Sequence, residues 1–101
     1  TADAAENTNE LIIPKTILSQ NYPNPFNPNT TINFVVNSEL ANQTELIIYN
    51  AKGQIIKQFP LITNQNYIVW NGTDMNDNNV SSGVYFYNLK LNNQVSRPKK
   101  M

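Results

Sequence analysis

The sequence predicts an all-β domain, an immunoglobulin-like antiparallel β-sandwich of about seven strands. Short apolar runs alternate with polar residues at the two-residue period of a half-buried strand, and no window has a helical period. Turn signals recur about every 8–12 residues, which is typical of a sandwich. Asparagine makes up about a fifth of the 101 residues, and it favours tight turns because it tolerates positive φ.

Composition limits the class of protein. The chain is short enough for one domain, and 7 basic and 7 acidic residues give a net charge of zero. We therefore expect no nucleic-acid partner, and no apolar run is long enough for direct membrane insertion. There is no cysteine and no histidine, which excludes disulfides and removes the commonest general base. We find no catalytic constellation, and expect no enzyme, cofactor or metal.

The chain divides into two parts. Residues 1–15 predict a linker or flexible N-terminal segment, because the first ten are small, polar and acidic. Residues 16–101 predict the sandwich. Within the linker, residues 11–13 could add an edge strand that Pro14 limits. The chain starts at Thr1 without a signal-peptide pattern, so we expect it to be a piece of a longer protein.

A stiff corner precedes the first long strand. Three prolines in the run from Tyr22 to Pro28 fix φ and push the residues before them into extended or turn conformations. This segment can be neither a helix nor a central strand. We expect it to deliver the chain into a sheet, with Tyr22 and Phe26 covering the sheet's end.

The predicted strands are residues 16–20, 31–36, 44–50, 54–59, 66–70, 84–91 and 94–99. Gly53 suits the positive-φ position of a short hairpin loop, and residues 92–93 form a two-residue turn. Pro60 should stop the fourth strand, and Pro98 should make the last strand an edge.

In the strand over residues 84–91, polar residues mark the solvent side. We expect Asn88 and Lys90 to face solvent there. The opposite face should point inward, and it carries Tyr85, Tyr87, Leu89 and Leu91. The hydroxyls of both tyrosines should reach backbone groups at the sheet end.

Two features have competing interpretations. Oxygen side chains in residues 74–79 suggest a calcium loop, but the EF-hand pattern fails because Asn79 and Tyr85 replace the required Gly and Glu. Such residues also form turns by bonding their own backbone, and we favour that interpretation. Trp70 could stack on a sugar, but its apolar neighbours favour a core position.

The basic cluster over residues 97–100 also has two interpretations. Lysines commonly guard an edge strand against pairing with another chain. Alternatively, the cluster could recognise an acidic surface while the edge strand adds to a partner sheet.

Five blocks in this order resemble the C-terminal sorting domain of type IX (Por) secretion substrates, type A. They are residues 21–28, 48–54, 70–74, 82–87 and 99–101. The resemblance covers about residues 17–101. The related immunoglobulin-like domain of flagellar hook-capping proteins shares the loop after Trp70 and the strand after Gly83, but the proline corner favours the sorting domain.

The resemblance implies a targeting domain. Such a domain directs a cargo, placed before it in the same precursor, through the periplasm to the cell surface or the medium. Its partners would be the outer-membrane type IX translocon and a sortase-like peptidase, and a cleavage site within residues 1–15 would fit a flexible substrate. The implied sorting residues are Pro23, Asn24, Pro25, Gly53, Gly83, Tyr85, Lys99 and Lys100.

The chain departs from the family at two places. The family usually continues past the Lys-Lys-Met block, so a tail beyond Met101 is expected, and Asn71 replaces a usual aspartate. The alternative function is a structural or adhesive immunoglobulin-like module of a secreted multidomain protein, one that could bind carbohydrate. A sorting domain must end its precursor, whereas further domains can follow a module, so the stop codon of the parent gene distinguishes the two.

Overall fold

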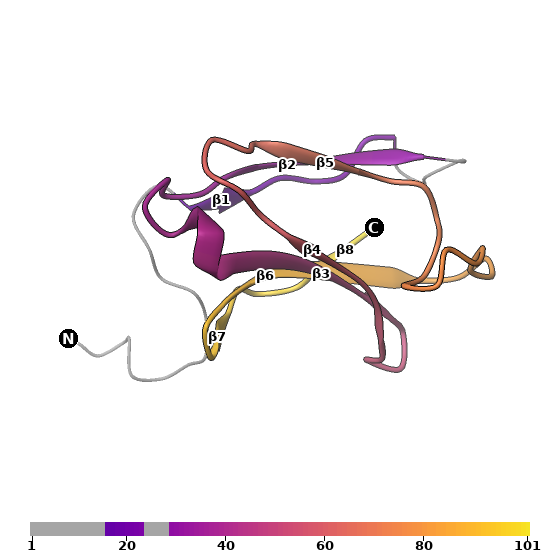
Figure 1. Ribbon diagram of the computed structural model, residues 1–101. Coiled ribbons are helices and arrows are strands. Elements are labelled where there is room, and N and C mark those ends of the chain that lie inside the picture. The colour runs from indigo at the N-terminus through magenta and orange to yellow at the C-terminus, as the bar shows by residue number, and fades with distance from the viewer. Residues whose placement is uncertain (1–15, 24–28) are drawn as a thin grey trace.

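The computed structural model describes residues 16–23 and 29–101, which form two facing antiparallel sheets (Figure 1). This confirms the predicted all-β sandwich. The described strands are β1 (Ile17–Leu18), β2 (Thr30–Val35), β3 (Thr44–Asn50), β4 (Ile55–Pro60), β5 (Tyr67–Trp70), β6 (Tyr85–Leu91), β7 (Gln94–Val95) and β8 (Lys99–Lys100). A single 3₁₀ turn, η1 (Ala41–Gln43), precedes β3. The linker and its edge strand were predicted for residues outside the described ranges.

The two sheets differ in size. The smaller has the order β1-β2-β5, and the larger has the order β4-β3-β6-β7, with β8 also paired to β6. The centre of the larger sheet is the β3–β6 pair, whose register runs from Thr44 opposite Leu91 to Asn50 opposite Tyr85. In the described residues, no helix is both long and apolar enough to cross a membrane.

The core lies between the sheets and follows the predicted two-residue period. Alternate side chains of β2 and β5 meet alternate side chains of β3 and β6. The buried cluster is Ile32, Phe34, Leu46, Ile48, Leu61, Ile68, Trp70, Tyr85, Tyr87 and Leu89. The Trp70 and Tyr85 rings cross the layers edge to face, with centroids 5.4 Å apart.

The last predicted strand is in fact two strands. Between β7 and β8, the Ser96 hydroxyl accepts the Leu89 N–H at 2.9 Å, and the Ser96 N–H donates to the Leu89 carbonyl at 2.8 Å. These bonds replace regular pairing, and Pro98 cannot donate to a ladder. Pairing with β6 resumes at Lys99, opposite Tyr87.

The prediction that Asn88 faces solvent is wrong. Asn88 does lie on the outer face of β6, but it is only 5% exposed. The segment between β7 and β8 folds against it, and its Nδ2 donates to the Ser96 carbonyl at 3.4 Å. Two-residue periodicity predicted the face correctly but could not show that the face is covered.

One prediction at Pro60 is confirmed, and one in the proline corner needs correction. Strand β4 ends at Pro60, which pairs opposite Glu45 because β4 is an edge strand in which a missing N–H is tolerated. Tyr22 does not cover the sheet's end, since its side chain is 77% exposed; its backbone instead bridges to Thr31. Phe26 lies outside the described residues.

Candidate functional site

The β3–β4 hairpin is held by one asparagine. Asn50 Oδ1 accepts the N–H groups of Lys52 and Gln54, both at 2.9 Å, and the Asn50 carbonyl accepts the Gly53 N–H at 3.0 Å. Gly53 has φ of +82°, which confirms the prediction of a positive-φ glycine. The loop is therefore rigid although its residues are exposed.

The segment before β6 lies beside this hairpin. Residues 50–52, 54 and 81–85 line a shared hollow of about 300 Å³. The Tyr85 ring points into the core, and its hydroxyl donates to the Ser81 carbonyl at 2.6 Å, which ties the segment down. Gly83 has no positive φ, and an added Cβ would meet nothing within 4 Å. Packing therefore makes no demand for glycine at position 83.

Strand β8 carries the two lysines that the resemblance implies. Lys100 is exposed and Lys99 is half-buried, while the next residue, Met101, donates its N–H to the Tyr85 carbonyl at 2.9 Å and packs against the core. Gln20 donates its side-chain N–H to the Lys100 carbonyl at 2.8 Å. The side chain of Gln20 thus partly covers the outer edge of β8. Nothing in the sequence indicated this contact.

Pro23 anchors the described part of the proline corner. Its carbonyl accepts the Asn21 amide at 3.1 Å and the Thr30 hydroxyl at 2.9 Å, and both of these donors are buried. Asn24 and Pro25 lie outside the described residues.

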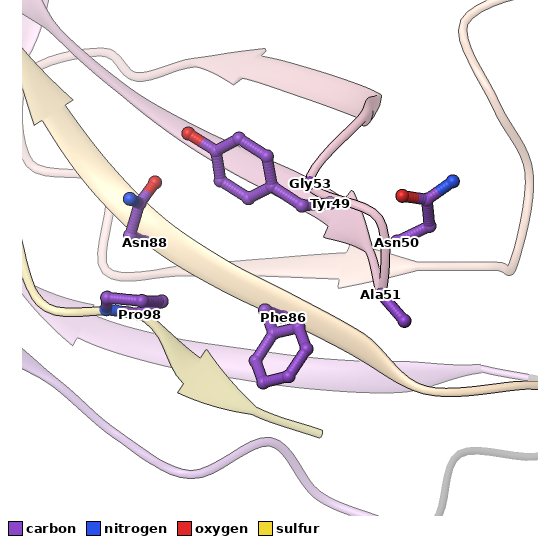
Figure 2. A pocket seen from close by; sticks show the side chains of 7 residues that line it. All are labelled: Tyr49, Asn50, Ala51, Gly53, Phe86, Asn88 and Pro98. Carbon is purple, nitrogen blue, oxygen red and sulfur yellow. The ribbon is translucent and has the colours of Figure 1, made fainter.

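A second hollow, on the outer face of the larger sheet, adjoins the other side of the hairpin (Figure 2). It has a volume of about 340 Å³ and extends from Gly53 across Phe86 to Pro98, next to Lys99. Figure 1 shows the hairpin and the β5–β6 loop at the same end of the sandwich, on the right. Three of the five blocks singled out in the sequence, residues 48–54, 82–87 and 99–101, therefore meet around this end.

Comparison with known proteins agrees with these blocks. The family model of the CHU_C type IX secretion signal domain matches residues 12–101. The chain belongs to this family. No curated protein and no solved structure matches it. The chain is thus a sorting signal that targets protein for type IX secretion, toward the cell surface or the medium. The family of such signal domains is not a catalytic family.

In this signal domain, a lysine holds the loop proposed for calcium. Asp74 Oδ1 accepts the N–H groups of Asn76 and Asn78 at 2.9 and 3.0 Å, which is the predicted backbone turn. Lys57 Nζ reaches the Asp74 carbonyl at 2.8 Å and Asp77 Oδ1 at 3.3 Å. A side-chain ammonium therefore lies among the loop oxygens, which supports the turn interpretation.

The two aromatic predictions of the signal domain are also resolved. Trp70 is fully buried and donates its indole N–H to the Thr73 carbonyl at 2.8 Å, so it lies in the core and presents no face to a sugar. The Tyr87 hydroxyl donates to the Ser19 carbonyl, joining the sheets. Burial raises the pKa of Tyr87 to about 12, against a smaller lowering by a backbone hydrogen bond from Asn21.

Proposed function

We propose that the type IX translocon of the outer membrane reads the end of the sandwich formed by the β3–β4 hairpin, residues 81–85 and β8. The observation that carries this proposal is that Gly53 and Gly83, far apart in sequence, line two hollows that share the hairpin residues Asn50 and Ala51. Lys99 directly follows Pro98, which lines the first of these hollows. Rigid turns present these groups at little entropic cost, which favours tight recognition. Lys99 and Lys100 would supply orientation and on-rate toward an acidic partner surface.

The proposal extends to the route of the cargo. The cargo would lie before residue 1 in the same precursor and cross the periplasm with the folded signal domain. A sortase-like peptidase would then cut within residues 1–15 on the far side of the outer membrane. The small, polar composition of that segment supports this assignment, because a peptidase needs an extended substrate.

A secretion assay tests the proposal. A signal peptide and a fluorescent protein are fused before the domain in a host with the type IX machinery. We expect the reporter at the cell surface with the unchanged domain, and a loss of several-fold with Lys99→Ala/Lys100→Ala. The matched control is Lys90→Ala, in the same sheet near its opposite end.

Each result has a defined meaning. If the unchanged fusion stays in the periplasm while the machinery exports its own substrates, the translocon does not read this domain. If the double alanine variant is exported like the unchanged fusion, the basic pair is only a guard on an edge strand.

A further inference from the structure

The hollow on the outer face of the larger sheet is lined by rings and by uncharged side chains. Its walls include the rings of Tyr49, Phe86 and Pro98, with Ala51 at the hairpin end (Figure 2). Its lining residues include no Lys, Arg, Asp or Glu. An ionised ligand group would therefore lose water here without gaining a partner of opposite charge.

One polar side chain in the hollow lacks a partner. Asn88 is 5% exposed, and its Oδ1 is a buried oxygen with no hydrogen bond, one of two such side-chain atoms in the described residues. Its Nδ2 is turned to the Ser96 carbonyl, so Oδ1 points the other way, toward the Tyr49 side of the hollow (Figure 2). Leaving a buried acceptor without a donor destabilises the folded state, and a bound donor would remove this penalty.

These two features together define a ligand chemistry. A flat ring can pack against the aromatic and proline walls, and an N–H or O–H on its edge can pair with Asn88 Oδ1. A purely aliphatic group would leave that oxygen unpaired. We propose that the hollow binds an aromatic side chain with a hydrogen-bond donor, of the tryptophan type, presented by a polypeptide of the secretion machinery.

The choice of a polypeptide rests on the proposed function, because the hollow is continuous with the proposed recognition end. It begins at Gly53 and ends at Pro98, directly before the two lysines of β8. The Lys100 carbonyl is already held by Gln20, so strand addition at this edge is restricted. A side-chain anchor in the hollow would give the partner a contact that the edge cannot provide.

The first test uses indole as the probe and 1-methylindole as its matched control without the N–H. We expect indole, at millimolar concentration, to shift the amide NMR signals of Ala51, Gly53, Phe86 and Asn88. We expect 1-methylindole to bind about tenfold more weakly, because it cannot donate to Asn88. In Asn88→Leu, whose fold is checked by the same spectrum, the two probes should bind equally.

The second test uses the secretion reporter. Ala51 is exposed at the rim, so Ala51→Leu narrows the hollow without disturbing strand pairing. We expect Ala51→Leu to abolish the indole shifts and reduce export several-fold. Asn42→Leu, at a position in η1 that is also exposed and lies before the other end of β3, should leave export unchanged.

Three results would overturn the inference. The first is an absence of indole-induced shifts in the NMR signals of the hollow, and the second is normal export of Ala51→Leu. The third is a change of these NMR signals with protein concentration together with the sedimentation mass of a dimer, which would make a second copy of the domain the occupant. Failure of the proposed function is distinct, because the unchanged fusion would then stay in the periplasm whatever the probes do.

Discussion

At the residue scale, single polar groups decide how the two sheets are joined. The Tyr87 hydroxyl reaches the Ser19 carbonyl from the opposite sheet, and its ring is fully buried. A buried hydroxyl with a partner contributes modestly, but removing it leaves the partner carbonyl unpaired. We expect Tyr87 to make the stability of the domain depend on alkaline pH.

Tyr87 should make the domain lose stability above pH 10. The pKa of Tyr87 is raised to about 12 in the folded state from 10.0, so the unfolded state releases the proton first. The stabilisation is complete below pH 10 and is lost as the pH rises to about 12. Urea unfolding should show a slope of up to about 1.4 kcal/mol per pH unit in this window that Tyr87→Phe lacks.

The Phe variant also has a neutral-pH control. At pH 7 it should be less stable by about 1–3 kcal/mol, because the Ser19 carbonyl loses its donor. Parallel pH profiles of the two proteins above pH 10 would show that Tyr87 does not carry the dependence.

Gly53 and Gly83 should respond to alanine with opposite signs. At φ of +82°, Gly53→Ala should destabilise by about 1–2 kcal/mol, because an L side chain is strained there. Gly83→Ala should be neutral or stabilising by up to about 1 kcal/mol, since its Cβ meets open space and the unfolded chain loses entropy.

The secretion assay tests whether Gly83 has a role in recognition that is separate from stability. If Gly83 contributes to recognition, Gly83→Ala should reduce export without reducing stability. Normal export of this variant would remove Gly83 from the proposed recognition surface.

At the scale of elements, the β5–β6 loop depends on a side chain from another strand. Lys57 extends from β4 to the Asp74 carbonyl, the Thr73 hydroxyl and Asp77 Oδ1. Its side chain is only 16% exposed, whereas that of Asp77 is 87% exposed. The bonds to Thr73 and Asp74 should therefore matter more than the solvent-screened ion pair.

Replacing Lys57 with Met should loosen this loop. We expect Lys57→Met to lower the free energy of unfolding by about 1–2 kcal/mol, from the lost hydrogen bonds of a charged donor. Hydrogen exchange should be faster at the amides of Asn76 and Asn78. Lys52→Met, in the exposed hairpin, is the control and should change stability by less than about 0.5 kcal/mol.

The same element bears on calcium. If the loop is a backbone turn, added Ca²⁺ should change neither the melting temperature of the unchanged domain nor that of Lys57→Met. A rise in either melting temperature would show a metal site, and a larger rise in Lys57→Met would show that the lysine competes for it.

At the scale of the whole molecule, the last residues close the sandwich. Met101 packs against the core, and β8 pairs with β6 while accepting the Gln20 side chain. Removing these residues would therefore change the fold as well as any recognition signal. An export defect after such a deletion has two explanations, which point substitutions can separate.

We expect deletion of residues 99–101 to lower stability by more than about 2 kcal/mol, through the lost burial of Met101 and the lost pairing of β8. Lys99→Ala/Lys100→Ala keeps the backbone and Met101, and should stay within about 1 kcal/mol of the unchanged domain in urea unfolding. Equal stability of the deletion and the unchanged domain would mean that β8 contributes nothing to the fold.

The sequence by itself determined the fold class, the β3–β4 hairpin and the inward face of β6. These follow from local physics: a two-residue apolar period and the φ preference of Gly53. The family was indicated separately, by the resemblance of five sequence blocks to the sorting domain. The sequence also suggested correctly that residues 74–79 turn on their own backbone.

Only the tertiary structure decided which separate residues meet. Gln20 reaches the Lys100 carbonyl across 80 residues, Lys57 fills the β5–β6 loop, and Asn88 is buried under a segment that leaves regular pairing at Ser96. Such contacts depend on sheet order, register and the break in the last strand. Local propensities do not encode these, because the interactions exist only once distant strands have paired.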